Sequence, residues 1–313
     1  MLLEIKNLHF AYSPEKKLFT NLNLRIGKGK IVALAGESGC GKSTLLSLIY
    51  GLYDWDQGSI IFEGTPLMGP KGNIVPGEQN MKFVAQNYDL MPYSTVYDNV
   101  GKYLSNIDLK AKRNHVMELL ELVDLTDYAD VKPKFLSGGQ QQRVAIARAL
   151  SVLPKMLLLD EPFSNLDFPR KIELREKLFG YAKKHDIAII ISTHDIQEIM
   201  PWLDQIIILQ DGRLIQNDSP EETYLAPYND YVAKLFGEVN ILTEAQQRQL
   251  NAPKRYLFPE DLELSENGLN ATVTESRFAG SHYRTRISCQ DIPLLMHSPT
   301  ALSGNITLKF RTL

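Results

Sequence analysis

The chain has 313 residues, of which 44% are apolar and 23% charged, values near the globular average that exclude a disordered or fibrous protein. This length favours one large domain and one small one. A net charge of −3, without a run of lysine and arginine, argues against nucleic acid as a partner, and two cysteines are too few for a disulfide framework, which favours a reducing cytosol.

The N-terminal residues lack the basic and apolar regions of a secretory signal. The apolar runs are also far shorter than the ~18 residues that a membrane span needs. We therefore expect any association with a membrane to depend on a partner protein.

Residues 1–30 predict antiparallel strands, because apolar and polar residues alternate between glycine-bearing turns. Residues 31–35 form an apolar run that leads into a glycine-rich loop and a helical pattern at 42–50, which predicts a strand, loop and helix unit. The pattern then turns helical, with helices expected at 95–106 and 110–125. Strands are expected at 156–159, 187–192 and 205–210, with a helical stretch between the first two, as a parallel sheet requires. Asp211-Gly212 predicts a hairpin turn after them.

The character of the sequence changes towards the C-terminus. Residues 220–236 predict a helix, and we expect the Gln- and Asn-bearing segment 244–253 to be a linker. Short β-like runs come after it at 271–274, 282–288 and 305–310, separated by glycine, proline and polar turns. These runs predict a small all-β domain.

Residues 36–43 fit the phosphate-binding loop pattern G-x-x-x-x-G-K-[ST]. Glycines allow backbone N–H groups to surround phosphate oxygens, the lysine reaches the β and γ phosphates, and the serine hydroxyl ligates Mg²⁺. Cys40 lies close to a helix N-terminus, which is expected to lower the pKa of its thiol, and its alkylation is expected to block nucleotide binding. The residues expected to bind nucleotide here are Gly36, Glu37, Ser38, Gly39, Cys40, Gly41, Lys42, Ser43 and Thr44.

Two adjacent acids, Asp160 and Glu161, stand at the carboxyl end of the apolar strand 156–159. Ligands of open α/β sheets bind at this edge. We expect Asp160 to hold Mg²⁺ through its shell, and Glu161 to face the attacking water as general base or water-positioning group.

The segment Leu136-Ser137-Gly138-Gly139-Gln140 matches the signature of the ATP-binding cassette ATPases, and the chain resembles that family over residues 1 to about 236. GTPases and small-molecule kinases lack this signature, and no guanine-specifying Asn-Lys-x-Asp motif appears. Ser137 and the N–H groups at the start of the helix expected at 139–150 can form a second nest for a γ-phosphate. In the family that phosphate belongs to ATP on another subunit. The resemblance therefore implies a head-to-tail dimer, with a second copy or a paralogous ATPase, whose sites are completed by residues Ser137, Gly138, Gly139 and Gln140 of the neighbour.

The resemblance also implies roles for four residues outside these motifs. Tyr12 falls where an aromatic residue stacks on adenine, although Phe10 points to the same face and a place in the core is the alternative. Gln86 falls where a glutamine contacts Mg²⁺ and the attacking water. Asp167 ends the loop 164–167, which resembles the loop that couples the two sites, and His194 resembles the switch histidine that contacts the γ-phosphate. The implied catalytic set is Glu161, His194 and Gln86, and the implied metal set is Ser43, Gln86 and Asp160.

The fold class that this resemblance implies is α/β: a P-loop NTPase cassette with a mixed sheet, an antiparallel β subdomain and a helical subdomain, then a small all-β OB-like domain. We expect the ATPase domain to span residues 1–236, with its helical subdomain at about 88–150. Residues 237–313 are expected to form a linker and the small β domain. ATP and Mg²⁺ are the expected cofactors.

The C-terminal segment resembles the small TOBE-like β domain of importer ATPases, through residues 257–262 and 278–283. Phe258 departs from that pattern, because the group usually has arginine there, and about 75 residues is short for the domain. The resemblance is nearest to the ferric-iron and polyamine group. The alternatives are a soluble ATPase that remodels an assembly without transport, or an exporter subunit.

The resemblance implies partners that the chain does not contain. An importer ATPase would need an integral membrane permease, received by the helical segment around residues 93–100, and an external solute-binding protein. Its expected location is the cytoplasmic face of the cell (inner) membrane, as a peripheral protein. Nucleic acid is not expected among its partners.

Overall fold

The computed structural model describes residues 1–311 of the chain. These residues divide into two compact units, an N-terminal unit from Met1 to Thr223 and a C-terminal unit that begins at Tyr224. The domain boundary expected from the sequence lies later, after residue 236. Each unit has an apolar core of its own.

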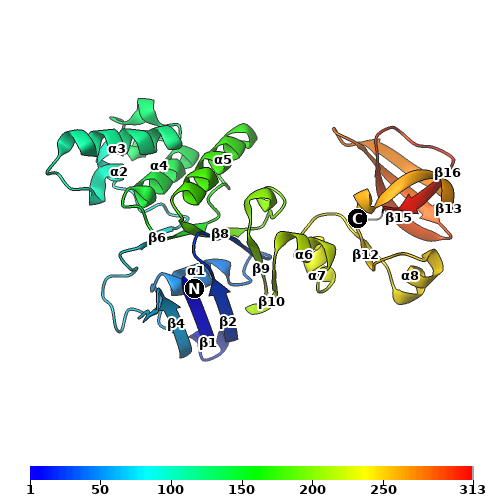
Figure 1. The fold of residues 1–313 in the computed structure, drawn as a ribbon, viewed down its shortest axis with the longest axis horizontal. Helices are drawn as coiled ribbons and strands as arrows, with labels where there is room; N and C mark the ends of the chain where they lie inside the picture. The colour runs from blue at the N-terminus through cyan, green and yellow to red at the C-terminus, as the bar shows by residue number, and fades with distance from the viewer. Residues whose placement is uncertain (312–313) are drawn as a thin grey trace. The chain divides into compact units, whose positions relative to one another are not determined.

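A six-stranded sheet in the order β10-β9-β3-β8-β7-β6 forms the centre of the N-terminal unit (Figure 1). Five of its strands run parallel and β10 is antiparallel to β9, which confirms the mixed sheet. The parallel strands are continuous apolar runs because both faces are buried. Asp211 and Gly212 have positive φ values, 47° and 72°, which confirms the hairpin turn. The bounds are β3 Ile31–Ala35, β6 Met81–Val84, β7 Met156–Asp160, β8 Ala188–Thr193, β9 Gln205–Gln210 and β10 Arg213–Asp218.

An antiparallel sheet in the order β2-β1-β4-β5 packs its apolar side chains with those of helix α1 (Lys42–Ile49) in one core. Phe19 of this sheet is 1% exposed, and a Cβ added to Gly41 would stand 2.9 Å from its ring. Gly41 also has a φ of 112°, so the core and the backbone both require glycine where the loop enters α1. The strands are β1 Leu3–Ser13, β2 Lys16–Ile26, β4 Gln57–Phe62 and β5 Thr65–Pro66.

Helices α2 to α5 lie on one side of strands β6 and β8, and strands β1, β2 and β4 on the other (Figure 1). The first helix expected here, at 95–106, is shorter: it is capped by Thr95 and Asp98 and gives way to a 3-10 turn after Val100. The second agrees with α3. The elements are α2 Val96–Val100, η1 Gly101–Tyr103, α3 Leu109–Leu122, η2 Thr126–Tyr128, η3 Pro133–Phe135, α4 Gly138–Leu150, α5 Phe168–Lys184 and η4 Met200–Trp202.

The helix expected at 220–236 is two helices, α6 (Pro220–Leu225) and α7 (Asp230–Lys234). Pro227 explains the break, because proline disfavours helical backbone at the residue before it and offers no N–H. Asn229 then caps α7 through a hydrogen bond from Val232 N to Asn229 Oδ1 of 3.0 Å.

The C-terminal unit contains a four-stranded antiparallel sheet in the order β15-β14-β13-β16. In its apolar core, Ile287, Leu294 and Leu308 are nearly inaccessible. This sheet fits the expected small OB-like domain. Its elements are β11 Asn240–Ile241, α8 Glu244–Leu250, β12 Tyr256–Leu257, η5 Pro259–Asp261, β13 Leu262–Phe278, β14 Tyr283–Cys289, β15 Ile292–Ser298 and β16 Asn305–Phe310.

The segment expected to be a linker, 244–253, contains helix α8 instead. Thr243 and Gln246 form a capping box at its start: Thr243 N donates to Gln246 Oε1 at 2.9 Å, and Gln246 N to Thr243 Oγ1 at 3.2 Å. Leu250 at its end is buried in the core of the unit. The Thr-x-x-Gln spacing was the local signal that an interpretation based on polar composition missed.

Phe258 replaces an expected arginine with a core aromatic. It is 1% exposed and stacks on Tyr224, with ring centroids 4.3 Å apart and an interplanar angle of 11°. Asp261 accepts a hydrogen bond of 2.7 Å from Phe258 N and pairs with Lys254 at 2.9 Å. The departure therefore changes the packing of this corner of the C-terminal unit.

Candidate nucleotide site

The phosphate loop is held between the buried strand β3 and helix α1, as the sequence predicts. Lys42 is only 6% exposed, and its ammonium donates to the carbonyl oxygens of Gly36 and Glu37 at 2.8 and 2.9 Å. The loop thus fixes the position of the charge that phosphate oxygens would meet. Tethered in this way, Lys42 needs little rearrangement to bind an anion.

The two strand-end carboxylates stand in different surroundings. Asp160 Oδ1 accepts hydrogen bonds from Ser43 Oγ at 3.0 Å and from Ser192 Oγ at 2.6 Å. A serine hydroxyl and a carboxylate beside a phosphate loop suit Mg²⁺, which is bound by one or two carboxylates together with phosphate oxygens. Among residues 1–311, no group of three or more His, Cys, Asp or Glu is placed to hold a metal ion.

Glu161 comes directly after Asp160 in a left-handed conformation, with a φ of 48°. Its N–H donates to Ser192 Oγ at 2.9 Å, and its carbonyl accepts from Ser164 Oγ at 3.0 Å and from Gln142 Nε2 at 3.1 Å. Backbone in this region is strained for a residue with a Cβ and persists only when its surroundings hold it. His194 Nδ1 lies 3.7 Å from Glu161 Oε1, so the structure brings the proposed base and switch histidine together.

A cavity of about 430 Å³ is lined by nine of the nineteen predicted site residues. This volume lies within the range of small-molecule sites. Its lining includes Tyr12, Ser38, Gly39, Gly41, Lys42, Ser43, Thr44, Gln86 and Glu161, together with Lys16, Lys17 and Leu18, which the sequence did not indicate.

Tyr12 is half exposed, so it is not a core residue like Phe10, which is 5% exposed. Its hydroxyl is hydrogen-bonded to Thr44 Oγ1 at 2.5 Å, and Lys16 Nζ lies 5.5 Å from the ring centroid. The ring is therefore oriented by the start of α1. Stacking on adenine stays a prediction.

The signature segment does not line this cavity. Ser137 caps α4, because Ser137 Oγ accepts from Gln140 N at 3.3 Å and Gln140 Oε1 accepts from Ser137 N at 2.9 Å. Gly139 packs closely: a Cβ there would stand 2.6 Å from the carbonyl oxygen of Asn165. Asp167 is likewise outside the cavity, exposed at the start of α5 and paired with Arg170 at 3.6 Å. One chain therefore leaves its signature facing outwards.

Contacts between distant segments, which the sequence did not indicate, tie helix α4 to the site. Arg148 donates to the carbonyls of Tyr88 and Asp89 at 2.8 and 2.6 Å, just after Gln86. Asn165 Nδ2 donates to the hydroxyl of Tyr88 at 2.5 Å. No local pattern predicts such pairings, which join residues far apart in sequence.

The pKa expected for Cys40 was wrong in direction. Burial raises the pKa of the Cys40 thiol, and the nearby Lys42 ammonium offsets this only in part. The helix N-terminus does not compensate for desolvation of a thiolate inside the core. The residue packs as an apolar side chain among the leucines of the N-terminal core.

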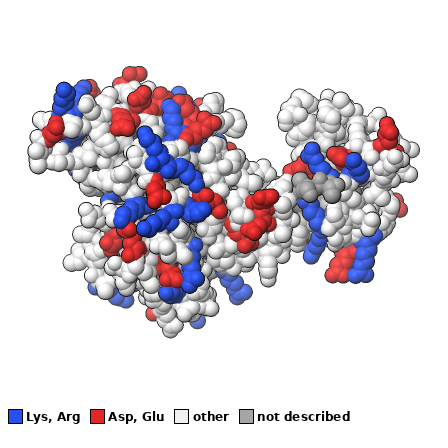
Figure 2. All heavy atoms as spheres, in the orientation of Figure 1, with Lys and Arg blue, Asp and Glu red and all other residues white. Residues whose placement is uncertain are grey.

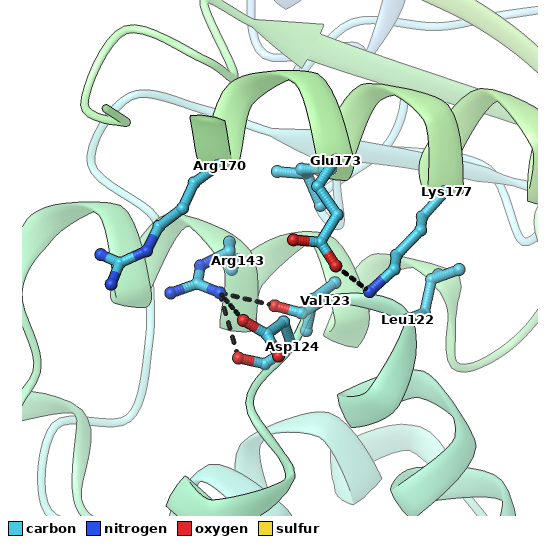
Figure 3. A pocket seen from close by; sticks show the side chains of 8 residues that line it. Leu122, Val123, Asp124, Arg143, Arg170, Glu173 and Lys177 are labelled. Carbon is cyan, nitrogen blue, oxygen red and sulfur yellow. Dashed lines mark hydrogen bonds and ion pairs between the residues drawn. The ribbon is translucent and has the colours of Figure 1, made fainter. Parts of the chain in front are cut away.

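A second cavity in the N-terminal unit is too small for a ligand. It has about 10 Å³ and lies between the end of α3 and helices α4 and α5 (Figure 3). Arg143, which is 5% exposed, lines this cavity and donates to the carbonyls of Val123 and Asp124 at 2.9 and 3.0 Å.

On the face shown in Figure 2, basic and acidic side chains are interspersed.

Proteins of known role resemble this chain over most of its length. The profile of the ABC transporter family matches residues 19–164. The chain is 38% identical over 259 residues to the spermidine/putrescine import ATP-binding protein PotA of Pasteurella multocida, with 80% of this chain and 68% of that protein covered. It is 33% identical over 322 residues to PotA of Borreliella afzelii, with 95% and 92% covered. The alignment with PotA of Haemophilus influenzae strain Rd spans only 64% of that protein.

Solved structures share the cassette. The dimeric post-hydrolysis state of the ATP-binding cassette MJ0796, bound to ADP and Pi, has a TM-score of 0.63 and 31% identity, and covers 70% of this chain and 99% of that chain. A bacterial Atm1-family ABC exporter with ATP bound has a TM-score of 0.65 and 25% identity, with 75% of this chain and 41% of that chain covered.

The fold and the phosphate site define an ATP-binding cassette ATPase. The chain belongs to the ABC transporter family, and it is the ATP-binding, ATP-hydrolysing subunit of an importer. The family, fold class and function predicted from the sequence are thereby confirmed. As an import subunit it is membrane-associated. Within residues 1–311, no helix combines the length and apolar character needed to cross a membrane.

Proposed function

We propose that this subunit powers the import of polyamines. The observation that carries the proposal is the match to the spermidine/putrescine import protein of Borreliella afzelii, which reaches 33% identity and extends over 92% of that protein, C-terminal region included. Within importers, the sequence resemblance left ferric iron as the neighbouring candidate, and the curated relatives favour polyamines.

The proposed catalytic unit is a head-to-tail dimer, with a second copy or a paralogous ATPase. Lys42 and the loop amides would hold the phosphates, and Ser43, Asp160 and Gln86 would hold Mg²⁺, whose charge would stabilise the phosphoryl transfer. Glu161 orients or deprotonates the attacking water, with His194 beside it. Tyr12 stacks on adenine, while Ser137 to Gln140 and Asp167 serve the neighbour's site. The outward-facing signature supports this arrangement, because it leaves a phosphate nest without a partner inside its own cavity.

The other proposed partners are an integral permease and an external solute-binding protein, at the cytoplasmic face of the inner membrane. The helical lobe is the proposed receiver of the permease. Tyr93 and Phe135 there are 73% and 72% exposed, and Lys134 Nζ lies 5.0 and 4.8 Å from their ring centroids, so the two rings belong to one exposed apolar patch. The C-terminal unit is the proposed TOBE-like domain.

The test is ATP hydrolysis by the reconstituted complex. The subunit, its permease and its binding protein would be placed in liposomes, and ATPase activity measured with spermidine, putrescine, ferric iron or a sugar. We expect the two polyamines to stimulate hydrolysis severalfold and the others to have no effect. Stimulation by ferric iron alone would contradict the polyamine proposal while leaving the importer intact.

A further inference from the structure

Glu161 is held through its backbone by a residue of the signature helix. Gln142, the fifth residue of α4, donates from Nε2 to the carbonyl oxygen of Glu161 at 3.1 Å. Its side chain is 2% exposed, so water does not compete for this hydrogen bond. The contact joins the helix that starts with Ser137 to the strand end that carries the proposed base.

The Glu161 backbone needs such support. Its φ of 48° lies in the left-handed region, which costs a residue other than glycine about 1 kcal/mol or more. Three side chains form hydrogen bonds with the backbone of this residue. Ser192 accepts from its N–H, and Gln142 and Ser164 donate to its carbonyl. The direction of the Glu161 carboxylate depends on this backbone conformation.

Gln142 is poorly placed for a purely structural role. Its Oε1 is buried and has no hydrogen-bond partner within residues 1–311. A buried amide oxygen without a partner destabilises a fold. The side chain therefore contributes one useful hydrogen bond at a stability cost, and that bond is made to Glu161.

Helix α4 can transmit displacement to this bond. The next residue, Arg143, ties α4 to the end of α3 through two backbone carbonyls (Figure 3), and Arg148 ties it to Tyr88 and Asp89 beyond Gln86. A helix moves as a rigid rod over this length. A movement of the signature helix therefore changes the donor that restrains the Glu161 backbone.

We propose that Gln142 is a positioning residue for Glu161, which couples the signature helix of a chain to the water-activating carboxylate of the same chain. This inference rests on the proposed role of Glu161. It adds that contact between the signature of one chain and the nucleotide of the neighbouring chain would adjust Glu161 at the first chain's own site.

The experiment compares Gln142→Met with Gln141→Met in the full-length chain. Methionine keeps the length of the side chain and removes the donor. For Gln142→Met we expect kcat for ATP hydrolysis to fall about 10- to 100-fold, as for a misplaced catalytic group, with KM for ATP changed less than about twofold. The ATP-dependent dimer should persist, and Tm should stay within about 3 °C because the partnerless amide oxygen is removed as well. Gln141, whose Nε2 bonds to the Leu136 carbonyl at 3.1 Å and is partly exposed, should tolerate the change.

A double-mutant cycle separates this inference from the role of Glu161. If Gln142 acts through Glu161, Gln142→Met should cost nothing further in single-turnover hydrolysis when added to Glu161→Gln. Equal losses in both backgrounds, an unchanged kcat, or a raised KM with kcat intact would each overturn the inference. Full activity of Glu161→Gln alone would overturn the proposed role of Glu161 and the inference with it.

Ser164→Ala keeps the proposal testable if Gln142→Met does not fold. Ser164 is exposed, and its hydroxyl is a second donor to the same carbonyl. We expect a smaller fall in kcat, about two- to fivefold, again without a change in KM. A fall in kcat that persists undiminished in the Glu161→Gln background would count against the inference.

Discussion

Two helices of this chain begin with the same capping chemistry and differ in the residues of their first turn. Helix α4 starts at Ser137 and is closed by Gln140, and helix α8 starts at Thr243 and is closed by Gln246, in each case by reciprocal hydrogen bonds. In α8 the residue after the cap is Glu244, whose charge complements the helix dipole. In α4 the residues after the cap are Gly138 and Gly139, and apart from its chain neighbours and the backbone of its own helix, no described atom lies within 4 Å of the position of a Cβ on Gly138.

The cap of α8 only completes its helix, whereas the cap of α4 also leaves the first backbone amides of the helix accessible to a ligand. In α8 the positive potential of the helix N-terminus is neutralised by Glu244 of the same helix. In α4 no acid stands in the first turn, and a glycine leaves the backbone amides approachable. The difference suits a phosphate from outside the chain. It can be tested by exchanging features between the two caps.

The largest effect is expected from a bulky charge at the α4 cap. Ser137→Arg should lower ATP hydrolysis at least about 100-fold, as when a donor to a transition state is removed, because the side chain stands where a neighbour's phosphate would approach. ATP binding to the single chain should be unchanged when measured by calorimetry.

Thr243→Arg is the matched control for that variant. It removes an equivalent cap and should cost about 1 kcal/mol of stability, with ATPase activity retained. Normal cooperative hydrolysis by Ser137→Arg would refute the shared site. Equal losses in both variants would show that the cap alone matters.

A smaller effect is expected when α4 is given the acid that α8 carries. Gly138→Glu should lower ATPase activity about 30-fold, because a charge worth about 2 kcal/mol at a helix N-terminus would oppose a phosphate. Gly138→Ala should stay within about threefold of the original, since the position has room for a methyl group. An acid without effect would mean that the γ-phosphate does not meet this helix end.

The smallest effect concerns the two cysteines, one in each unit. Burial raises the pKa of both thiols, so few thiolates are present at neutral pH, and alkylation by iodoacetamide should be slow and still accelerate above pH 9. Mass spectrometry should show that ATP protects Cys40 in the phosphate loop and leaves the labelling of Cys289 unchanged. Equal protection of both thiols would indicate global stabilisation instead.

The predicted site residues that the structure brings close together are those with a local sequence cause. Strand β3 is an apolar run, and the loop after it has a fixed pattern, so the sequence alone indicates Lys42, Ser43 and Thr44, and all three line the cavity. The sequence indicates Asp160 and Glu161 because a buried strand ends in acids. In these cases residues adjacent in sequence perform one task.

The parts that were missed depend on pairings across the fold. Ser192 and Gln142 hold Glu161 from positions 31 and 19 residues away. The apolar spacing of residues 220–236 predicted one continuous helix, but Pro227 breaks it into two. The polar composition of residues 244–253 predicted a linker, but the cap at Thr243 starts a helix there. The pKa of Cys40 depended on burial, which a helix-terminus argument does not include.

The hydroxyl of Ser192 links the two strand-end acids, Asp160 and Glu161, to strand β8. It accepts the N–H of Glu161 and donates its single proton to Asp160, at 2.9 and 2.6 Å. Strand β8 therefore holds both acids through one atom, Ser192 Oγ, which lies two residues before His194. Any shift of β8 would therefore displace the Asp160 carboxylate and the Glu161 backbone together.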